Sequence, residues 1–135
     1  MKREPELFEQ TILVQESDLD ELRHVNNVRY VQWMEDIAKS HWEQRAPAEV
    51  KAKYIWMVIR HEIDYKSQAF LDDEILLQTH VGEHTLVTSQ RHVIIRNKTT
   101  QKIIIQAKST WCLLNAKTHK PAKISEEIFE DFYKK

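Results

Sequence analysis

Residues 17–36 read SDLDELRHVNNVRYVQWMED and place two aspartates, a histidine and two asparagines directly before an amphipathic pattern. From Val28 onward, mostly apolar side chains recur at the three- and four-residue spacing that marks one face of a helix. The members of this face are Val28, Val31, Met34, Ile37, Ala38, His41 and Trp42. The spacing predicts one helix of about four or five turns, capped by Asn26 or Asn27 and ending before Pro47.

Downstream of this helix the hydrophobic period changes to two residues, which is typical of strands. The period predicts four long strands, over residues 55–65, 74–81, 87–96 and 103–114, and a shorter strand over residues 7–15 before the polar stretch. Gly82-Glu83 and residues 97–101 supply turn residues between consecutive strands, so we expect antiparallel hairpins there. A short helix is predicted over residues 125–133, with Ser125 as its N-cap.

The order of these elements indicates the α+β class. A lone helix must bury its apolar face, and the antiparallel sheet is the only partner of adequate size. We therefore expect one domain over residues 1–135, in which a five-stranded antiparallel sheet wraps around one long central helix and a short C-terminal helix follows. Such a sheet leaves an edge that monomers rarely expose, so pairing with a second copy is expected, as a homodimer or a dimer of dimers.

The composition argues against several classes of function. The formal net charge is −1, so no overall field attracts the protein to nucleic acid or to an anionic membrane. No apolar run approaches the ~20 residues of a membrane helix, and MKREPELFEQ lacks a secretory h-region, so a cytoplasmic location is expected. Gly82 is the only glycine, which rules out glycine-rich phosphate loops. We expect no cofactor.

Two other features favour structural interpretations. Cys112 follows Trp111 within a strand pattern, which favours a buried core cysteine over a nucleophile. His80 and His84 flank the predicted turn at Gly82, and no third ligand is spaced to complete a zinc site. The sequence therefore predicts no metal.

The polar stretch carries a resemblance to a known family. DLDELRHVNNVRY, residues 18–30, resembles the D-x-D-x-x-G-H-V-x-N-x-x-Y signature of hot-dog fold thioesterases, in particular the hydroxybenzoyl-coenzyme A thioesterase branch. HVNNVRY is similar to the corresponding segment of acyl-acyl-carrier-protein thioesterases. IDYKSQAFLDDEI and STWCLLNAKTHKPAKISEEI are similar to later segments of the family, so the resemblance covers about residues 8–129. It implies the hot-dog fold, whose element order the periodicity predicts independently.

Three positions depart from the family pattern. Arg23 and Asp72 stand where the family usually carries glycine, at turn positions where a positive φ is often favoured. A non-glycine residue there costs strain or implies a different local turn. Leu22 stands where plant-type relatives carry an asparagine, so we do not expect a mechanism that needs that amide.

The resemblance implies hydrolysis of acyl thioesters, carried by coenzyme A or by acyl carrier protein, to a free acid and a thiol. Asp20 occupies the second aspartate position, where the family uses a carboxylate as nucleophile or as general base. His24 would orient water, bind the thioester oxygen or brace the loop. Free N–H groups at a helix N-terminus, here those of Asn27 and Val28, point toward a developing oxyanion and polarise the carbonyl. Glu35 ranks second as the base.

The acyl group needs a mainly apolar slot. We expect the substrate to contact Asn26, Tyr30, Met34, Met57 and Tyr65, although Asn26 also suits the ordinary role of a helix cap. A basic cluster near the C-terminus offers either a docking site for an acidic carrier protein or a solvated turn. Its members are Lys117, His119, Lys120 and Lys123.

Two other functions stay open. A non-catalytic module that binds acyl thioesters would keep the pocket and release no thiol. A hot-dog dehydratase or hydratase also pairs an aspartate with a histidine, usually five residues apart with a proline between them. Asp20 and His24 are four residues apart, and no proline lies between them. Thiol release separates the hydrolase from the binding module, and hydration of enoyl thioesters would identify the hydratase.

Overall fold

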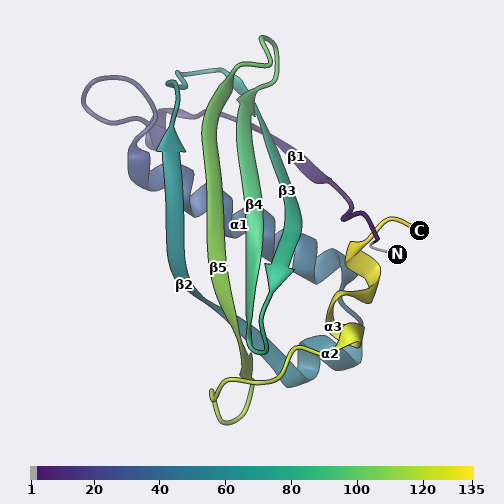
Figure 1. The fold of residues 1–135 in the computed structure, drawn as a ribbon. Coiled ribbons are helices and arrows are strands. Elements are labelled where there is room, and N and C mark those ends of the chain that lie inside the picture. Colours follow the sequence, from purple (N-terminus) through teal and green to yellow (C-terminus); the bar gives the residue numbers. More distant parts are fainter. Residues whose placement is uncertain (1–2) are drawn as a thin grey trace.

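The computed structural model describes residues 3–135 and contains one sheet with helices against it (Figure 1). The elements are β1 (Phe8–Leu13), η1 (Glu16–Asp18), α1 (Asn27–Arg45), α2 (Ala48–Lys53), β2 (Tyr54–Tyr65), β3 (Glu74–His84), β4 (Thr88–Asn97), β5 (Ile103–Asn115), α3 (Glu126–Phe129) and η2 (Glu130–Phe132), where η marks a single 3-10 turn. The strand order is β1-β3-β4-β5-β2, and every neighbouring pair is antiparallel. The predicted five-stranded antiparallel sheet and long helix are confirmed.

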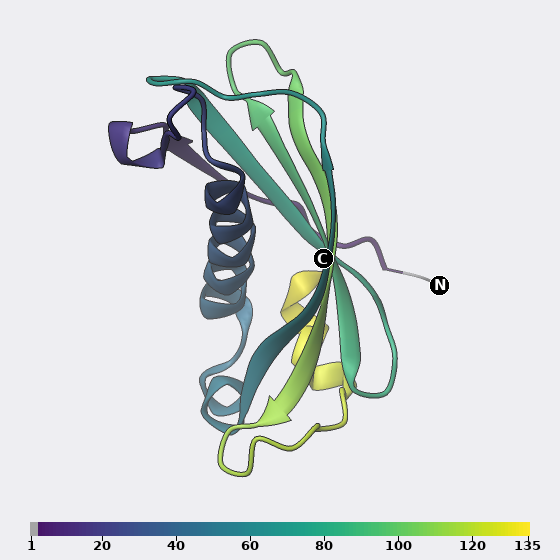
Figure 2. The same cartoon turned by 90° about the vertical axis from the view of Figure 1, so that its left-hand side faces the viewer.

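α1 lies along one face of the curved sheet (Figure 2). Its buried residues are Tyr30, Trp33, Met34, Ile37, Ala38 and His41. The last four belong to the predicted face, but Tyr30 and Trp33 begin it in place of Val28 and Val31, and Val28 is 74% exposed. The strands contribute alternate buried residues, such as Leu77 in β3 and Val93 in β4. α1 packs mainly against β1 and β3. No helix within residues 3–135 is long and apolar enough to cross a membrane.

A second apolar core lies beyond the C-terminal half of α1, where α2, α3 and η2 close the end of the sheet. Its buried members are Ala46, Val50, Val81, Leu113, Ile124, Ile128, Phe129 and Phe132. α2 was not predicted, because Pro47 begins a new helix: its carbonyl accepts from the N–H groups of Val50 and Lys51. The terminal helix is shorter than predicted, since α3 ends at Phe129 and a 3-10 turn follows.

β2 changes phase at a bulge in its middle, where the register against β5 shifts. Met57, before the bulge, lies on the outer face of the sheet and is 49% exposed. His61, after the bulge, faces α1 and contacts Glu35. The expectation that one alternation holds along residues 55–65 is wrong, because a bulge inserts an extra residue and reverses the side-chain direction.

The turn between β3 and β4 lies beyond Gly82, so the predicted turn position is wrong. β3 continues two residues further, and the turn is closed by the Thr85 N–H, which donates to the Thr88 carbonyl at 2.8 Å. Gly82 serves close packing instead, since a Cβ there would lie 2.8 Å from His92 Nε2. The predicted turn over residues 97–101 is confirmed between β4 and β5.

Candidate active site

A short hairpin over residues 18–26 carries the polar motif and leads directly into α1. The Asn26 N–H donates to the Asp18 carbonyl at 2.9 Å, and the Asp20 N–H donates to the His24 carbonyl at 2.9 Å. Between these pairs, residues 19 and 25 form an antiparallel bridge. The hairpin therefore fixes Asp20 and His24 relative to the first turn of the helix.

The Asp20 carboxylate lies close to the His24 ring, and one of its oxygens has no hydrogen bond within the described residues. Its Oδ1 accepts from the Leu22 N–H at 2.9 Å. Its Oδ2 lies 3.4 Å from His24 Nδ1, and the two side chains are 26% and 24% exposed. That nitrogen is buried and has no hydrogen-bond partner within residues 3–135. Asp20 Oδ2 therefore accepts no hydrogen bond from residues 3–135.

The N-terminus of α1 offers one free donor. Asn26 is the N-cap, and its Oδ1 accepts from the Val28 N–H at 3.0 Å. The Asn26 carbonyl also accepts from the Arg29 N–H at 2.8 Å. The Asn27 N–H has no acceptor among the residues that the structure describes. The sequence predicted two free donors here, but the cap occupies Val28 and leaves Asn27.

Asp18 and Arg23 brace the hairpin. Asp18 Oδ2 accepts from the Gln15 N–H at 2.8 Å, and its Oδ1 pairs with Arg29 Nε at 3.0 Å. Arg23 has φ 66° and pairs with Glu16. The hydrogen bond from Arg23 lowers the pKa of the Glu16 carboxyl. Of the two alternatives for this glycine-replacing position, the structure shows the positive φ.

The second glycine-replacing position behaves in the same way. Asp72 has φ 69° in the turn before β3. Asp73, next in the chain, ties this turn by accepting from the Phe70 N–H at 3.0 Å. Phe70 forms a backbone bridge with His24, and the two rings meet edge to face with 6.4 Å between their centroids. The turn therefore supports His24 from the side of the sheet.

The predicted substrate contacts do not lie together. Tyr30 is 1% exposed, its Oη accepts from the Ala69 N–H at 3.0 Å, and burial raises its pKa. Met34 is also 1% exposed within the core, whereas Met57 lies on the opposite face of the sheet. Tyr65 is 48% exposed, and its ring centroid lies 6.3 Å from that of Tyr30. Tyr65 is thus the aromatic member best placed to reach a ligand.

A second polar chain crosses from α1 to the sheet. Glu35 Oε2 lies 3.3 Å from His61 Nε2, and His61 Nδ1 lies 2.6 Å from Ser109 Oγ. The sequence pointed to Glu35 as a second base and missed its contacts with His61 and, through that ring, with Ser109. The available signal was a small polar residue in β5 at a position that alternation directs toward α1.

Metal chemistry finds no support in the described part of the chain. Within residues 3–135, no three His, Cys, Asp or Glu side chains gather as a metal site requires. His80 stacks on His92, with 4.8 Å between the ring centroids. Cys112 is buried and unpaired by any disulfide.

Comparison with known proteins gives a family for this arrangement. The acyl-ACP thioesterase N-terminal domain matches residues 5–132, which is nearly the whole chain. The chloroplastic acyl-[acyl-carrier-protein] hydrolase FATB3 of Cuphea viscosissima is 29% identical over 87 residues, or 64% of this chain and 21% of that protein. The chain spans about a fifth of the length of the curated relatives it matches.

Solved structures show the same fold at lower identity. The probable thioesterase YbaW of Escherichia coli matches with a TM-score of 0.82 and 20% identity, over 93% of this chain and 98% of that one. A Staphylococcus aureus protein solved in complex with CoA matches with a TM-score of 0.84 and 13% identity, over 97% and 84% of the two chains. The chain therefore has the hot-dog fold and belongs to the family of the acyl-ACP thioesterase N-terminal domain.

Proposed function

We propose that this chain hydrolyses acyl thioesters of coenzyme A or acyl carrier protein to a free acid and a thiol. The observation that carries the proposal is the hairpin of residues 18–26, which joins the Asp20 carboxylate to the helix end where the Asn27 N–H lacks an acceptor among the described residues. Thioester hydrolysis needs a group that acts on the acyl carbon or on water and a donor for the carbonyl oxygen. A carboxylate and a free amide at one helix N-terminus supply both.

Asp20 has two chemically complete routes. As a general base it takes a proton from water while the water oxygen attacks the acyl carbon; the C–S bond then breaks and the thiolate takes up the proton. As a nucleophile an Asp20 oxygen bonds to the acyl carbon, the thiolate leaves, and water hydrolyses the mixed anhydride. Rapid-quench mass spectrometry distinguishes the routes, because only the nucleophile leaves an acyl adduct on the Asp20 peptide.

The carbonyl oxygen would accept a hydrogen bond from the Asn27 N–H. The positive end of the α1 macrodipole lies at the same place and favours the developing negative charge. Val28 would contribute a second donor only if Asn26 released it, which would sacrifice the helix cap. One preorganised donor is typically worth ~3 kcal/mol of barrier.

Both carriers fit the comparisons, and a second copy fits the sheet edge. One relative is named as a hydrolase of acyl-[acyl-carrier-protein], and one structural neighbour was solved with CoA. β2 ends the sheet and exposes Ile55, Met57 and Ile59 by 41%, 49% and 52%. An exposed apolar edge strand favours pairing, so we expect a homodimer or a dimer of dimers, which light scattering would measure.

The test is thiol release from acetyl, octanoyl, palmitoyl and benzoyl thioesters of coenzyme A and from octanoyl-acyl carrier protein. We expect wild type to turn over at least one of them and Asp20→Asn to lose ~10²–10⁴-fold in kcat. Asp36→Asn is the matched control, because Asp36 is an exposed carboxylate on α1 that bonds only Gln32. Full activity of Asp20→Asn would remove Asp20 from the chemistry.

Glu35 is the second candidate base, and its contact with His61 favours it. A carboxylate that holds an imidazole 3.3 Å away can orient that ring or share its proton. It lies eight residues beyond Asn27, about 12 Å along the helix axis. Loss of turnover in Glu35→Gln with full activity in Asp20→Asn would move the reaction there.

Two further outcomes identify the other functions. Tight binding of acyl thioesters with no thiol release by wild type would indicate a binding module. Hydration of an enoyl thioester, read as loss of its absorbance without release of thiol, would indicate the hydratase.

A further inference from the structure

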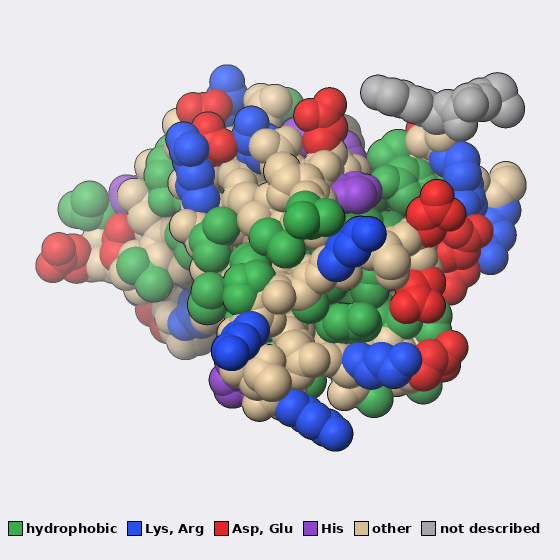
Figure 3. Space-filling view, turned by 60° about the horizontal axis from the view of Figure 1, so that its bottom comes forward, with side chains coloured by type: hydrophobic (Ala, Val, Ile, Leu, Met, Phe, Trp, Pro, Cys, Tyr) green, Lys and Arg blue, Asp and Glu red, His purple; other side chains and the backbone are tan. Residues whose placement is uncertain are grey.

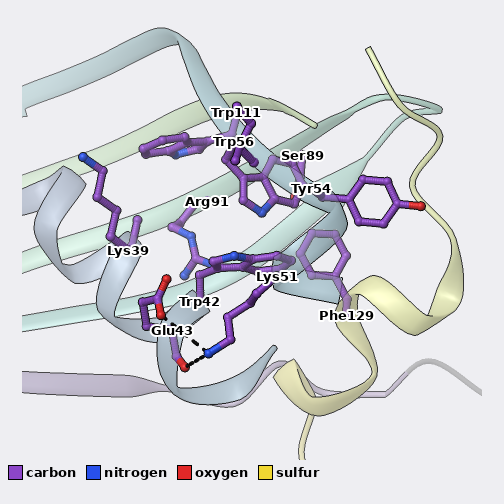
Figure 4. A pocket seen from close by; sticks show the side chains of 12 residues that line it. Lys39, Trp42, Glu43, Lys51, Tyr54, Trp56, Ser89, Arg91, Trp111 and Phe129 are labelled. Atoms are coloured by element: carbon purple, nitrogen blue, oxygen red, sulfur yellow. Dashed lines mark hydrogen bonds and ion pairs between the residues drawn. The ribbon is translucent and has the colours of Figure 1, made fainter. Parts of the chain in front are cut away.

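An aromatic cavity, partly open to solvent, lies toward the opposite end of α1 from the Asp20 hairpin. It occupies about 240 Å³ between the second half of α1, α2 and strands β2, β4 and β5. Its walls carry the aromatic side chains of Trp42, Tyr54, Trp56, Trp111 and Phe129 (Figure 4). The same end of the molecule presents hydrophobic surface bordered by Lys and Arg side chains (Figure 3).

Arg91 contributes a buried cation to this apolar cavity. It is 8% exposed, and its side chain points among the tryptophans (Figure 4). Its Nη1 donates to His41 Nδ1 at 2.9 Å and lies 3.3 Å from Thr79 Oγ1. Within residues 3–135 it forms no ion pair, and its Nε and Nη2 have no acceptor. Burial lowers its pKa to about 10, the direction expected of a desolvated cation.

Neither carboxylate beside this site forms an ion pair with Arg91 within residues 3–135. Glu43, on the cavity wall, lies 3.5 Å from Lys51 Nζ. Glu6 Oε1 binds His41 Nε2 at 2.8 Å and Arg45 Nε at 2.7 Å. Because His41 accepts at Nδ1 from Arg91, it carries its proton on Nε2 and donates to Glu6, so the ring is neutral. Burial and the Arg91 charge accordingly lower the pKa of His41 to about 4. Glu6 is paired with Arg45 and reaches Arg91 only through an uncharged ring.

Two more donors around the cavity lack good partners. Trp111 Nε1 is buried and has no acceptor within residues 3–135. Ser89 is 5% exposed, and its hydroxyl reaches only the Gln90 carbonyl, at 3.4 Å. Buried donors are normally satisfied, and unpaired ones on the wall of a cavity indicate a missing acceptor.

We propose that this cavity binds the carboxylate of a compact apolar acid. The carboxylate pairs with the free side of the Arg91 guanidinium, Trp111 and Ser89 donate to it, and the apolar body packs against the indole rings. A planar monoanion matches the guanidinium fork. The volume of about 240 Å³ lies below the ~300–1,000 Å³ of drug-sized sites, which favours a small acid over a nucleotide or a carrier.

The carboxylate has two possible sources with the same chemistry. It is either a free carboxylic acid or the far end of an acyl group whose thioester lies at the N-terminus of α1. Lys39, on the cavity wall, lies twelve residues beyond Asn27, about 18 Å along the helix axis. The second source rests on the proposed thioesterase function, whereas the first does not.

The binding test titrates the full chain with octanoate and 4-phenylbutanoate, and with the matching neutral amides, by tryptophan fluorescence at pH 8. We expect wild type to bind the acids at least tenfold more tightly than the amides. Arg91→Gln should abolish this preference. Arg96→Gln is the matched control, since Arg96 lies on the same strand but pairs with Gln78 on the other face of the sheet, and it should keep the preference.

Three results would overturn the proposal: equal binding of acid and amide by wild type, no binding of either acid, or an unchanged preference in folded Arg91→Gln. If Arg91→Gln fails to fold, the acid-to-amide ratio of wild type still decides. Trp111→Phe provides a second variant, because it keeps the aromatic wall, removes one donor and should weaken acid binding several-fold while leaving amide binding unchanged.

Hydrolysis distinguishes the two sources. Faster turnover of ω-carboxyacyl-coenzyme A than of the plain acyl-coenzyme A of equal length, with the advantage lost in Arg91→Gln, assigns the cavity to the end of the substrate. Equal turnover of the two thioesters, with tight binding of free octanoate, assigns it to a free acid. Absence of all thiol release would defeat the proposed function and leave the binding result intact.

Discussion

The two ends of α1 differ in how far the charged and polar groups beside them are exposed to solvent. At the N-terminal end Asp20 and His24 are about a quarter exposed, and the Asn27 N–H is free of any acceptor in the described chain. At the C-terminal half Arg91 and His41 are 8% and 0% exposed, enclosed by aromatic rings. The partly exposed Asp20 carboxylate can exchange protons with water. The buried Arg91 guanidinium can instead bind an anion that fits its cavity.

The helix dipole supports this division. Carboxylates are stabilised near the positive N-terminus of a helix and cations near its negative C-terminus. Asp20 lies at the first end, and Arg45 lies in the last turn at the second. We therefore interpret the N-terminal end as the place of chemistry and the C-terminal end as a place of recognition.

The largest expected effect is on stability. It distinguishes the buried groups beside the C-terminal half of α1 from the exposed groups beside its N-terminus. Phe132 is 0% exposed and packs edge to face on His41, with 4.6 Å between the ring centroids. Phe132→Ala should lower the free energy of unfolding by ~3–5 kcal/mol. Phe70→Ala, the same change beside the open site at a residue 51% exposed, should cost within ~0.5 kcal/mol. Urea unfolding measures both, and equal costs would contradict the division.

The next effect is on catalysis, and it tests the free backbone N–H at the N-terminus of α1. Asn27→Pro removes the free N–H yet suits the first helical position, because Asn26 has φ −64° and ψ 134°, the conformation required before proline. We expect kcat to fall ~10²–10³-fold with the melting temperature nearly unchanged.

Asn27→Ala is the control for this change, since it alters the side chain and keeps the N–H. It should retain kcat within a few-fold. Full activity of Asn27→Pro would show that this amide does not assist the reaction.

A smaller effect concerns the pH dependence of stability that the buried His41 causes. The native state holds His41 neutral with a pKa of about 4, below the ~6.5 of an unfolded histidine. The native state therefore binds fewer protons between these values, and the stability that His41 contributes is present above pH ~6.5 and lost as the pH falls through ~4. Its size is on the order of 3 kcal/mol. Unfolding curves of wild type and His41→Gln from pH 4 to 7 should converge at acid pH; parallel curves would contradict a buried neutral ring.

The smallest effect concerns Asn26, the N-cap of α1. Asn26→Ala removes the acceptor of the Val28 N–H and should cost ~1 kcal/mol of stability. It also leaves the Val28 N–H as a second free donor at the N-terminus of α1. Thermal unfolding measures the loss of stability. The KM for the acyl thioester reports on the freed donor, and we expect it within a few-fold of wild type.

The sequence predicted most of what depends on local spacing. The stripe from Met34 to His41 faces the sheet, and Asn26 caps the helix. Arg23 and Asp72 adopt the positive φ that is often favoured at their positions. Each of these properties follows from residues within a turn or two of one another. The polar motif therefore could be located before the fold was known.

Long-range register explains what the sequence did not predict. Arg91 meets His41 from 50 residues away, and His61 meets Ser109 across 48 residues. A bulge in β2 reverses the direction of Met57, and no local period reports a bulge. One signal for Arg91 was present: a charged residue at a strand position on the same phase as Val93 and Ile95, which are buried.

The most direct test of the central claim is a crystal structure with a non-hydrolysable ketone analogue of an acyl-coenzyme A substrate. We expect the carbonyl oxygen about 2.7–3.1 Å from the Asn27 nitrogen, with the Asp20 carboxylate in contact with the carbonyl carbon directly or through one water. A carbonyl held at Glu35 and His61, or anywhere out of reach of Asp20, would contradict it.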